Sequence, residues 1–276
     1  MAEISAADVA KLRKMTGAGM MDCKKALADS EGDFQKAVEF IRERGKAIAN
    51  KRTDREAKEG VVLSKVSDCG KYGAMIVLNC ETDFVAKNEA FVGFASSILD
   101  LTVKSRPENL EALKALPLDG TTVDEKIIQQ SGVIGEKIEL SFFDCVLGEQ
   151  SIAYIHPGNR LATLASFTVA GVDMQVYKDI AMQIAAMDPV AIDKGDVSQE
   201  IRDEEFKIGR EQARLEGKPE QMLDKIAEGR LNKFYQEKTL LNQEFIKDNK
   251  MNVGQYLKSA NKDLTVTAIK RYTLNV

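Results

Sequence analysis

One run of residues, Tyr72 to Cys80, constrains the fold more than any other part of the chain. It is almost entirely apolar and rich in residues that favour strands, which predicts a buried β-strand. Apolar residues then recur at helical spacing after a candidate N-cap at Asn88: Phe91, Phe94, Ala95, Ile98 and Leu101. The residues between, 82–88, are therefore expected to form a corner between a strand and a helix.

Phe84 in this corner has two interpretations. If the alternation of the strand continued, Phe84 would share a face with Ile76 and Leu78 and belong to the core, where aromatic side chains of loops usually pack. However, Phe84 belongs to no helical stripe and lies beside Asp83, a carboxylate with no obvious partner in the sequence. An aromatic ring next to a carboxylate would suit a probe that is inserted into another protein.

The first 54 residues are expected to form a bundle of three short helices. Ser5 is a candidate N-cap, a second helix is expected from about Asp22 to Ala28, and a third is expected to end before Gly45. Such a bundle has a thin core. Met20 and Met21 are expected in a loop, where either one fills the core or both contact a partner.

Further along the chain, the pattern of residue types changes twice. A polar, charged stretch at 50–59 predicts a solvated helix extension or linker. The order strand, turn, strand, helix then occurs at 60–101 and again at 141–187, which predicts an α+β fold with two related lobes packed back to back or side by side. The expected domains are residues 1–54, 55–140, 141–197 together with 239–276, and an insertion at 198–238.

The insertion at 198–238 is expected to be an antiparallel helical hairpin of the coiled-coil type. Ile201, Ile208 and Leu215 fall seven residues apart, and the sequence Gly-Lys-Pro at 217–219 forces a reversal. Each arm would reach roughly 25 Å. With so few apolar positions, the hairpin is expected to protrude from the protein.

Several function classes are excluded by what the sequence lacks. A formal net charge of −4 argues against direct binding of nucleic acid. Four separated cysteines and one histidine predict no zinc site or other metal site, and no catalytic or cofactor motif is found. The lone histidine, His156, lies in a turn, where exposure is more common than catalysis. Because the sequence lacks catalytic motifs, the protein is not expected to be an enzyme. Because it shows neither a signal peptide nor a membrane span, a cytoplasmic protein is expected.

Two motifs carry a resemblance to a known family. The string Thr-Asp-Phe-Val-Ala-Lys-Asn at 82–88 closely resembles the signature of the elongation factor Ts family. The stretch Thr-Gly-Ala-Gly-Met-Met-Asp-Cys-Lys-Lys-Ala-Leu at 16–27 resembles the N-terminal module of that family, which is similar to ubiquitin-associated domains. The resemblance extends over nearly the whole chain.

The resemblance implies a guanine nucleotide exchange factor for the translational GTPase elongation factor Tu. It implies that Phe84 wedges between helices of the GTPase while Asp83 and its neighbours displace magnesium. The implied partner contacts are Thr82, Asp83, Phe84 and Val85 in the corner, Leu12, Met20 and Met21 in the N-terminal module, and His156 and Gly158 in the second lobe. Pro157 departs from the histidine-glycine turn of the family. The hairpin would touch the partner or join two copies into a homodimer.

Two other classes of function remain open from the sequence. A ubiquitin-associated adaptor would bind its partner through the N-terminal bundle alone, so removal of residues 1 to 54 would abolish binding. An enzyme acting on a small molecule would need clustered titratable groups, and a cognate metabolite would raise its melting temperature.

Overall fold

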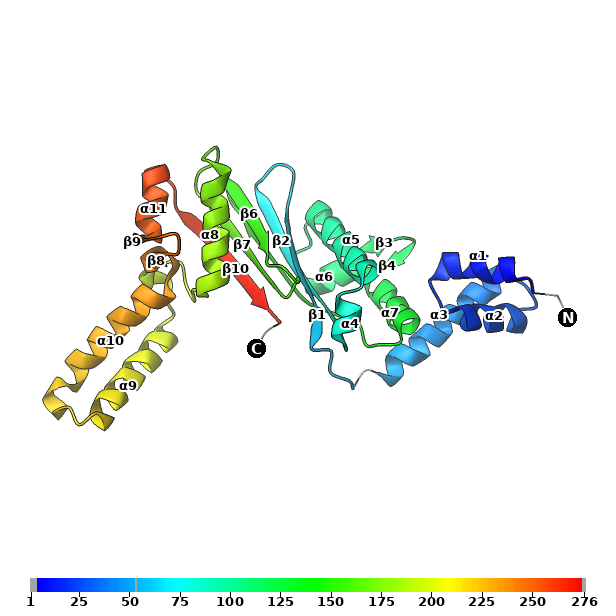
Figure 1. Ribbon diagram of the computed structural model, residues 1–276, viewed down its shortest axis with the longest axis horizontal. Helices are drawn as coiled ribbons and strands as arrows, with labels where there is room; N and C mark the ends of the chain where they lie inside the picture. Colours follow the sequence, from blue (N-terminus) through cyan, green and yellow to red (C-terminus); the bar gives the residue numbers. More distant parts are fainter. Residues whose placement is uncertain (1–3, 53, 275–276) are drawn as a thin grey trace.

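The computed structural model describes residues 4–52 and 54–274. Figure 1 shows an elongated molecule with a helical module at one end, two layered lobes in the middle and a helical hairpin at the other end. Helices and strands are mixed throughout the lobes, so the predicted α+β class is confirmed.

The N-terminal module consists of α1 (Ala6–Thr16), α2 (Met20–Asp29) and α3 (Phe34–Lys51). Ser5 and Asp8 form a capping box at the start of α1. Two expectations are corrected here. Helix α3 continues six residues past Gly45, and Met20 begins α2 instead of lying in a loop. The small core contains seven buried residues: Val9, Leu12, Ala18, Cys23, Ala26, Leu27 and Ala37.

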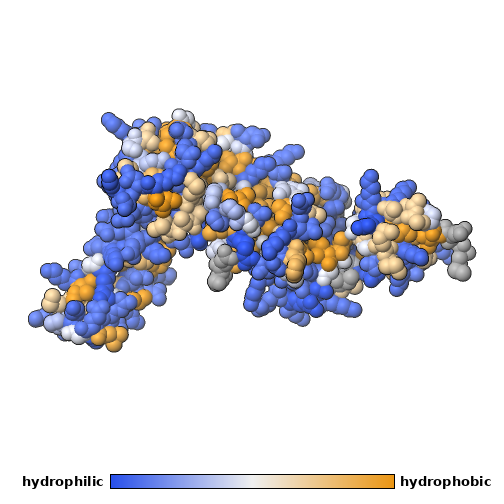
Figure 2. All heavy atoms as spheres, viewed as in Figure 1, coloured by the Kyte–Doolittle hydropathy of each residue, from blue (hydrophilic) through white to orange (hydrophobic). Residues whose placement is uncertain are grey.

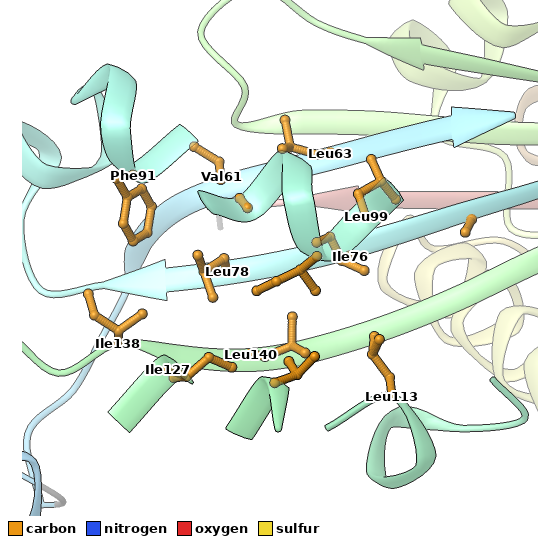
Figure 3. Packing of buried hydrophobic residues seen from close by; sticks show 14 of the residues in the cluster. Val61, Leu63, Ile76, Leu78, Phe91, Leu99, Leu113, Ile127, Ile138 and Leu140 are labelled. Atoms are coloured by element: carbon orange, nitrogen blue, oxygen red, sulfur yellow. The ribbon is translucent and has the colours of Figure 1, made fainter. Parts of the chain in front are cut away.

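The first lobe is built on an antiparallel sheet in the order β1-β2-β5, formed by Glu59–Val66, Tyr72–Cys80 and Glu139–Leu147. Its helices are α4 (Asp83–Ala86), α5 (Glu89–Ser105), α6 (Leu110–Ala115) and α7 (Val123–Ile134), and β3 (Pro117–Leu118) pairs with β4 (Thr121–Thr122) between α6 and α7. Figure 3 shows side chains of the three strands meeting those of α5, α6 and α7 in one apolar core.

The second lobe has an antiparallel sheet in the order β10-β7-β6, formed by Val266–Thr273, Leu161–Phe167 and Gln150–Ile155. Helix α8 (Met174–Met187) packs on one face of this sheet, together with α11 (Val253–Ala260). A small ribbon, β8 (Glu244–Phe245) and β9 (Asp248–Asn252), precedes α11, and short 3-10 turns lie at Lys194–Asp196, Glu220–Met222 and Leu240–Asn242.

The boundary expected at residue 141 is wrong, because β5 crosses it and pairs with β2 of the first sheet. Each lobe therefore consists of a hairpin, a helix and a third strand that pairs with the second strand of the hairpin. The internal repeat is real in topology, but its second copy begins at β6, near Gln150. Local sequence patterns identify a strand but not the sheet it joins.

The two sheets pack back to back. Met75 and Val77 of β2 face Ala162 and Leu164 of β7, whereas the alternate residues of β2 face the helices of the first lobe. All nine residues of β2 are therefore buried. Burial on both sides explains why the run Tyr72–Cys80 is apolar on both faces.

Helices α9 (Gln199–Leu215) and α10 (Leu223–Lys238) form the protruding hairpin, whose surface is mostly hydrophilic in Figure 2. The expected heptad seam is wrong: Ile208 is 42% and Leu215 80% exposed. Small residues fill the seam instead, because they allow the two helices to approach closely, and a Cβ atom on Gly209 would lie 3.4 Å from the Cα atom of Ala227. The buried residues of the hairpin are Gly209, Ala213, Leu223 and Ala227.

Candidate functional site

Phe84 is the centre of the candidate site. Its side chain is 84% exposed, and no large apolar side chain in residues 4–47, 50–52 and 54–274 is exposed to a larger fraction. The interpretation of Phe84 as a core residue is therefore wrong. Strand β2 ends at Cys80, and the helical turn α4 directs Ala86 and part of Val85 into the core while Phe84 points to solvent.

The one-turn helix α4 and helix α5, which follows it, each begin at a capping side chain. Thr82 is its N-cap, and its Oγ1 accepts a hydrogen bond from the Val85 N–H over 3.4 Å. Asn88, which ends the corner, caps α5 by accepting a hydrogen bond from the Ala90 N–H over 2.8 Å, as the sequence predicted. The corner is thus a defined turn between β2 and α5.

The Glu136 carboxylate holds the start of this turn. Its Oε2 accepts hydrogen bonds from the N–H groups of Glu81 and Thr82, each over 3.1 Å. Its Oε1 accepts one from Thr82 Oγ1 over 2.7 Å. Glu136 lies just after α7, so α7 fixes the corner from across the first lobe.

Glu81 links the corner to the segment that follows α3. Its Oε1 accepts hydrogen bonds from Arg52 over 2.8 Å and from the Lys137 N–H over 2.6 Å, while its Oε2 pairs with Arg55 over 3.0 Å. Partial burial alone would raise the pKa of Glu81, but these three donors outweigh it and lower the pKa from 4.5 to about 2. Glu81 is therefore ionised at neutral pH.

Asp83 presents a carboxylate next to Phe84. Lys87, one turn later, donates a hydrogen bond over 2.7 Å to Asp83 Oδ2, and this hydrogen bond lowers the pKa of Asp83. The pair is exposed, so solvent screens it and a stronger partner can compete for the carboxylate.

The second lobe brings the turn between β6 and β7 to the same region. The Val62 N–H of β1 donates a hydrogen bond over 2.7 Å to the Asn159 carbonyl of this turn. Asp83 and Gly158 line one pocket of about 220 Å³, together with Lys87 and Asn159. Residues predicted from two separate parts of the sequence thus lie on one surface.

His156 begins this turn and is exposed. Its N–H donates a hydrogen bond to the Leu161 carbonyl over 2.8 Å, and its Nδ1 lies 3.0 Å from Tyr154 Oη. Gly158 adopts a φ of +91°, which favours glycine. With Pro157 inserted, the turn still presents the imidazole to solvent.

In the N-terminal module, the predicted residues separate into two groups. Met20 is 46% and Met21 75% exposed, so both side chains are available to a partner. The expected contact at Leu12 is corrected, because Leu12 is fully buried in the core of the module and supports the bundle. Met15, near the end of α1, is also exposed, to 60%.

Within residues 4–52 and 54–274, no three histidine, cysteine or acidic side chains come together in a way that could hold a metal ion. No helix in the described part of the chain is long and apolar enough to cross a membrane.

Glu81 and Glu136 are the two site residues that sequence reasoning missed. Glu81 directly precedes the Thr-Asp-Phe-Val motif, which is a weak signal for an involvement in the corner. Glu136 is far away in the sequence, and no local pattern connects it to Thr82.

Comparison with known proteins gives a consistent result. A family model described as "Elongation factor TS" matches residues 81–275. The protein named "Elongation factor Ts" from Porphyromonas gingivalis is 54% identical over 269 residues, covering 97% of both chains. Proteins of the same name from Amoebophilus asiaticus and Azobacteroides pseudotrichonymphae are 49% and 47% identical, each over at least 97% of both chains. The family predicted from the two motifs is confirmed, and this chain belongs to the elongation factor Ts family of translation elongation factors.

Proposed function

We propose that this protein is a guanine nucleotide exchange factor that binds elongation factor Tu with GDP bound and promotes GDP release. The observation that carries the proposal is the exposed Phe84 on a turn fixed by Glu136. An exposed aromatic side chain is stabilised when a partner buries it, and a fixed turn loses little entropy in the process.

Phe84 acts as a wedge between helices of the GTPase. Full burial of a phenylalanine side chain contributes about 1.5 to 3 kcal/mol. If this contribution is larger for the nucleotide-free GTPase than for the GDP form, it accelerates release by roughly ten- to a hundredfold. The remainder of the acceleration comes from the other contacts.

Asp83 accompanies the wedge and disturbs the segment that holds magnesium. A carboxylate brought close to a bound Mg²⁺ offers it another oxygen ligand and repels the phosphates of the nucleotide. The ionised state of Asp83 at neutral pH supports this function. Lys87 releases the carboxylate when Asp83 reaches its target.

Met20 and Met21 in the N-terminal module and His156 and Gly158 in the second lobe anchor the complex on either side of the wedge. Flexible methionine side chains suit such a contact because they adapt to the surface they meet. Linkage requires that GDP weaken the binding of this protein by the same factor by which this protein weakens GDP.

The proposal is tested by stopped-flow release of a fluorescent GDP analogue from elongation factor Tu. The protein should raise the release rate in a saturable manner, and excess GDP should dissociate the complex. A release rate that does not change with protein concentration would rule out the exchange function.

A further inference from the structure

The N-terminal module contacts the first lobe where helix α3 crosses helix α7. Helices α3 and α7 meet at Gly45 and Gly132, where a Cβ atom on Gly132 would lie 2.2 Å from Gly45 Cα. A cavity of about 360 Å³ lies beside this crossing, and Met15, Ile41 and Val133 contribute to its lining. The crossing brings the two helices close together and leaves a cavity beside them.

A second connection lies one turn past the end of α3. Arg52 and Arg55 both pair with Glu81, whose side chain is only 14% exposed. A single exposed ion pair holds a segment weakly. Here one partly buried carboxylate accepts from two guanidinium groups, one at each oxygen, and from a backbone N–H. Hydrogen bonds of this charge-assisted kind are stronger than neutral ones.

The same residue is the immediate neighbour of the corner. The N–H of Glu81 donates to Glu136, and Thr82 follows as the N-cap of the helix that presents Phe84. The side chain of Glu81 therefore faces the module while its backbone is part of the corner.

We propose that Glu81 is a positioning residue that couples the N-terminal module to the Phe84 corner through Arg52 and Arg55, so that the two contact areas reach the GTPase as one unit. The inference rests on the proposed exchange function. It adds that Arg52 and Arg55 act as a fixed joint with Glu81, although the composition of 50–59 predicts a solvated helix extension or linker.

A fixed joint has a specific kinetic consequence. When one contact has formed, a rigid connection keeps the second at a high effective concentration, and a loose connection lowers it. Loss of the joint should therefore weaken binding. The maximal release rate should stay unchanged when the joint is removed at Arg52 and Arg55, because Glu81 and Glu136 still hold the corner.

Two variants abolish the ion pairs of the joint, one by changing the carboxylate and the other by changing the two arginines. Glu81→Gln keeps an oxygen that can accept from the Lys137 N–H but loses the charge that pairs with both arginines. The combined change Arg52→Gln and Arg55→Gln leaves the corner untouched. Glu149→Gln is the matched control, because it breaks an exposed ion pair with Lys71 near the start of β2, at the far end of that strand from the corner.

Release of fluorescent GDP from elongation factor Tu is measured over a concentration series of each full-length variant, with and without Met20→Ala and Met21→Ala. Both joint variants should raise the half-saturating concentration about tenfold. The Arg52 and Arg55 variant, which leaves the corner untouched, should keep the maximal rate of wild type. Adding the methionine changes should bring wild type and joint variants to the same half-saturating concentration. The control should behave as wild type.

If the joint changes and the methionine changes raised the half-saturating concentration by independent factors that multiply, the coupling would be overturned. A joint variant with a lower maximal rate and an unchanged half-saturating concentration would also overturn it. Small-angle scattering of the free proteins supplies a readout that does not need the GTPase. The joint variants should show a larger maximal dimension than wild type, and an unchanged dimension would overturn the joint. If wild type fails to accelerate release, the exchange function fails, and scattering still decides whether Glu81 positions the module.

Discussion

The Glu136 carboxylate accepts two hydrogen bonds from Thr82: one from Thr82 Oγ1 over 2.7 Å, and one from the Thr82 N–H over 3.1 Å at its other oxygen. Thr82 in turn caps the four-residue helix that presents Phe84. A helix this short is not stable by itself. The direction of Phe84 therefore depends on a side chain 54 residues away in the sequence.

Glu136→Ala should lower the maximal rate of GDP release about tenfold, because a loosened corner presents Phe84 in the productive direction for only a fraction of the time. The half-saturating concentration should change little, since the anchoring residues are intact. A matched control is Glu111→Ala, which removes an exposed glutamate paired with Lys114 on α6. Equal maximal rates for Glu136→Ala and wild type would show that the corner does not need this clamp.

Gly132→Ala should displace the N-terminal module, because the new methyl group would collide with the backbone of Gly45. Scattering should show a larger maximal dimension, and the melting temperature should fall. Gly229→Ala on α10 is the control, because nothing lies within 4 Å of its added Cβ atom. Removing a glycine from a helix interior should stabilise this control by about 0.5 to 1 kcal/mol. An unchanged dimension of Gly132→Ala would contradict the observed crossing.

The low pKa of Glu81 predicts a specific dependence of stability on pH. Because folding lowers this pKa from 4.5 to about 2, the ionised carboxylate stabilises the folded state above pH 4.5, and this stabilisation is lost as the pH falls toward 2. Urea unfolding of wild type and Glu81→Gln should give a constant difference in the free energy of unfolding from pH 7 to about pH 5. Below that, the two values should converge. A difference that grows toward acid would have the wrong sign for this interaction.

Leu12 and Met21 should give opposite results when each is changed to alanine. Leu12→Ala creates a cavity in the module core and should destabilise the module by about 2 to 5 kcal/mol, as measured by hydrogen exchange of α1 and α2 amides. Met21→Ala should leave exchange protection unchanged and raise the half-saturating concentration for GDP release. If Met21→Ala lowered protection as much as Leu12→Ala, Met21 would be a structural residue.

Much of the fold could be predicted from the sequence because apolar periodicity and capping residues act locally. The strand before the corner, the cap at Asn88 and the two arms of the hairpin all follow from such patterns. The pairing of strands that are far apart in the sequence cannot be predicted from such local patterns. The run at 139–147 reads as a strand in either lobe, and only its pairing with β2 assigns it to the first sheet.

The candidate site shows the same division. The motif at 82–85 identifies the corner, but the exposure of Phe84 depends on where β2 ends and on the contact with Glu136. In the hairpin, the heptad pattern of Ile208 and Leu215 indicates the wrong seam, because glycine and alanine allow a closer approach than large residues do. Small residues carry little signal in a hydrophobic pattern although they determine how closely two helices pack.

The measurement that tests the wedge most directly compares Phe84→Ala with Leu147→Ala in stopped-flow release of fluorescent GDP from elongation factor Tu. Leu147 is 67% exposed and pairs with Tyr72 at the far end of β2 from the corner, so its change removes a similar amount of exposed apolar surface elsewhere. Phe84→Ala should slow the maximal release rate by about ten- to a hundredfold, whereas Leu147→Ala should match wild type. Equal rates for Phe84→Ala and wild type would contradict the proposal that Phe84 is the wedge.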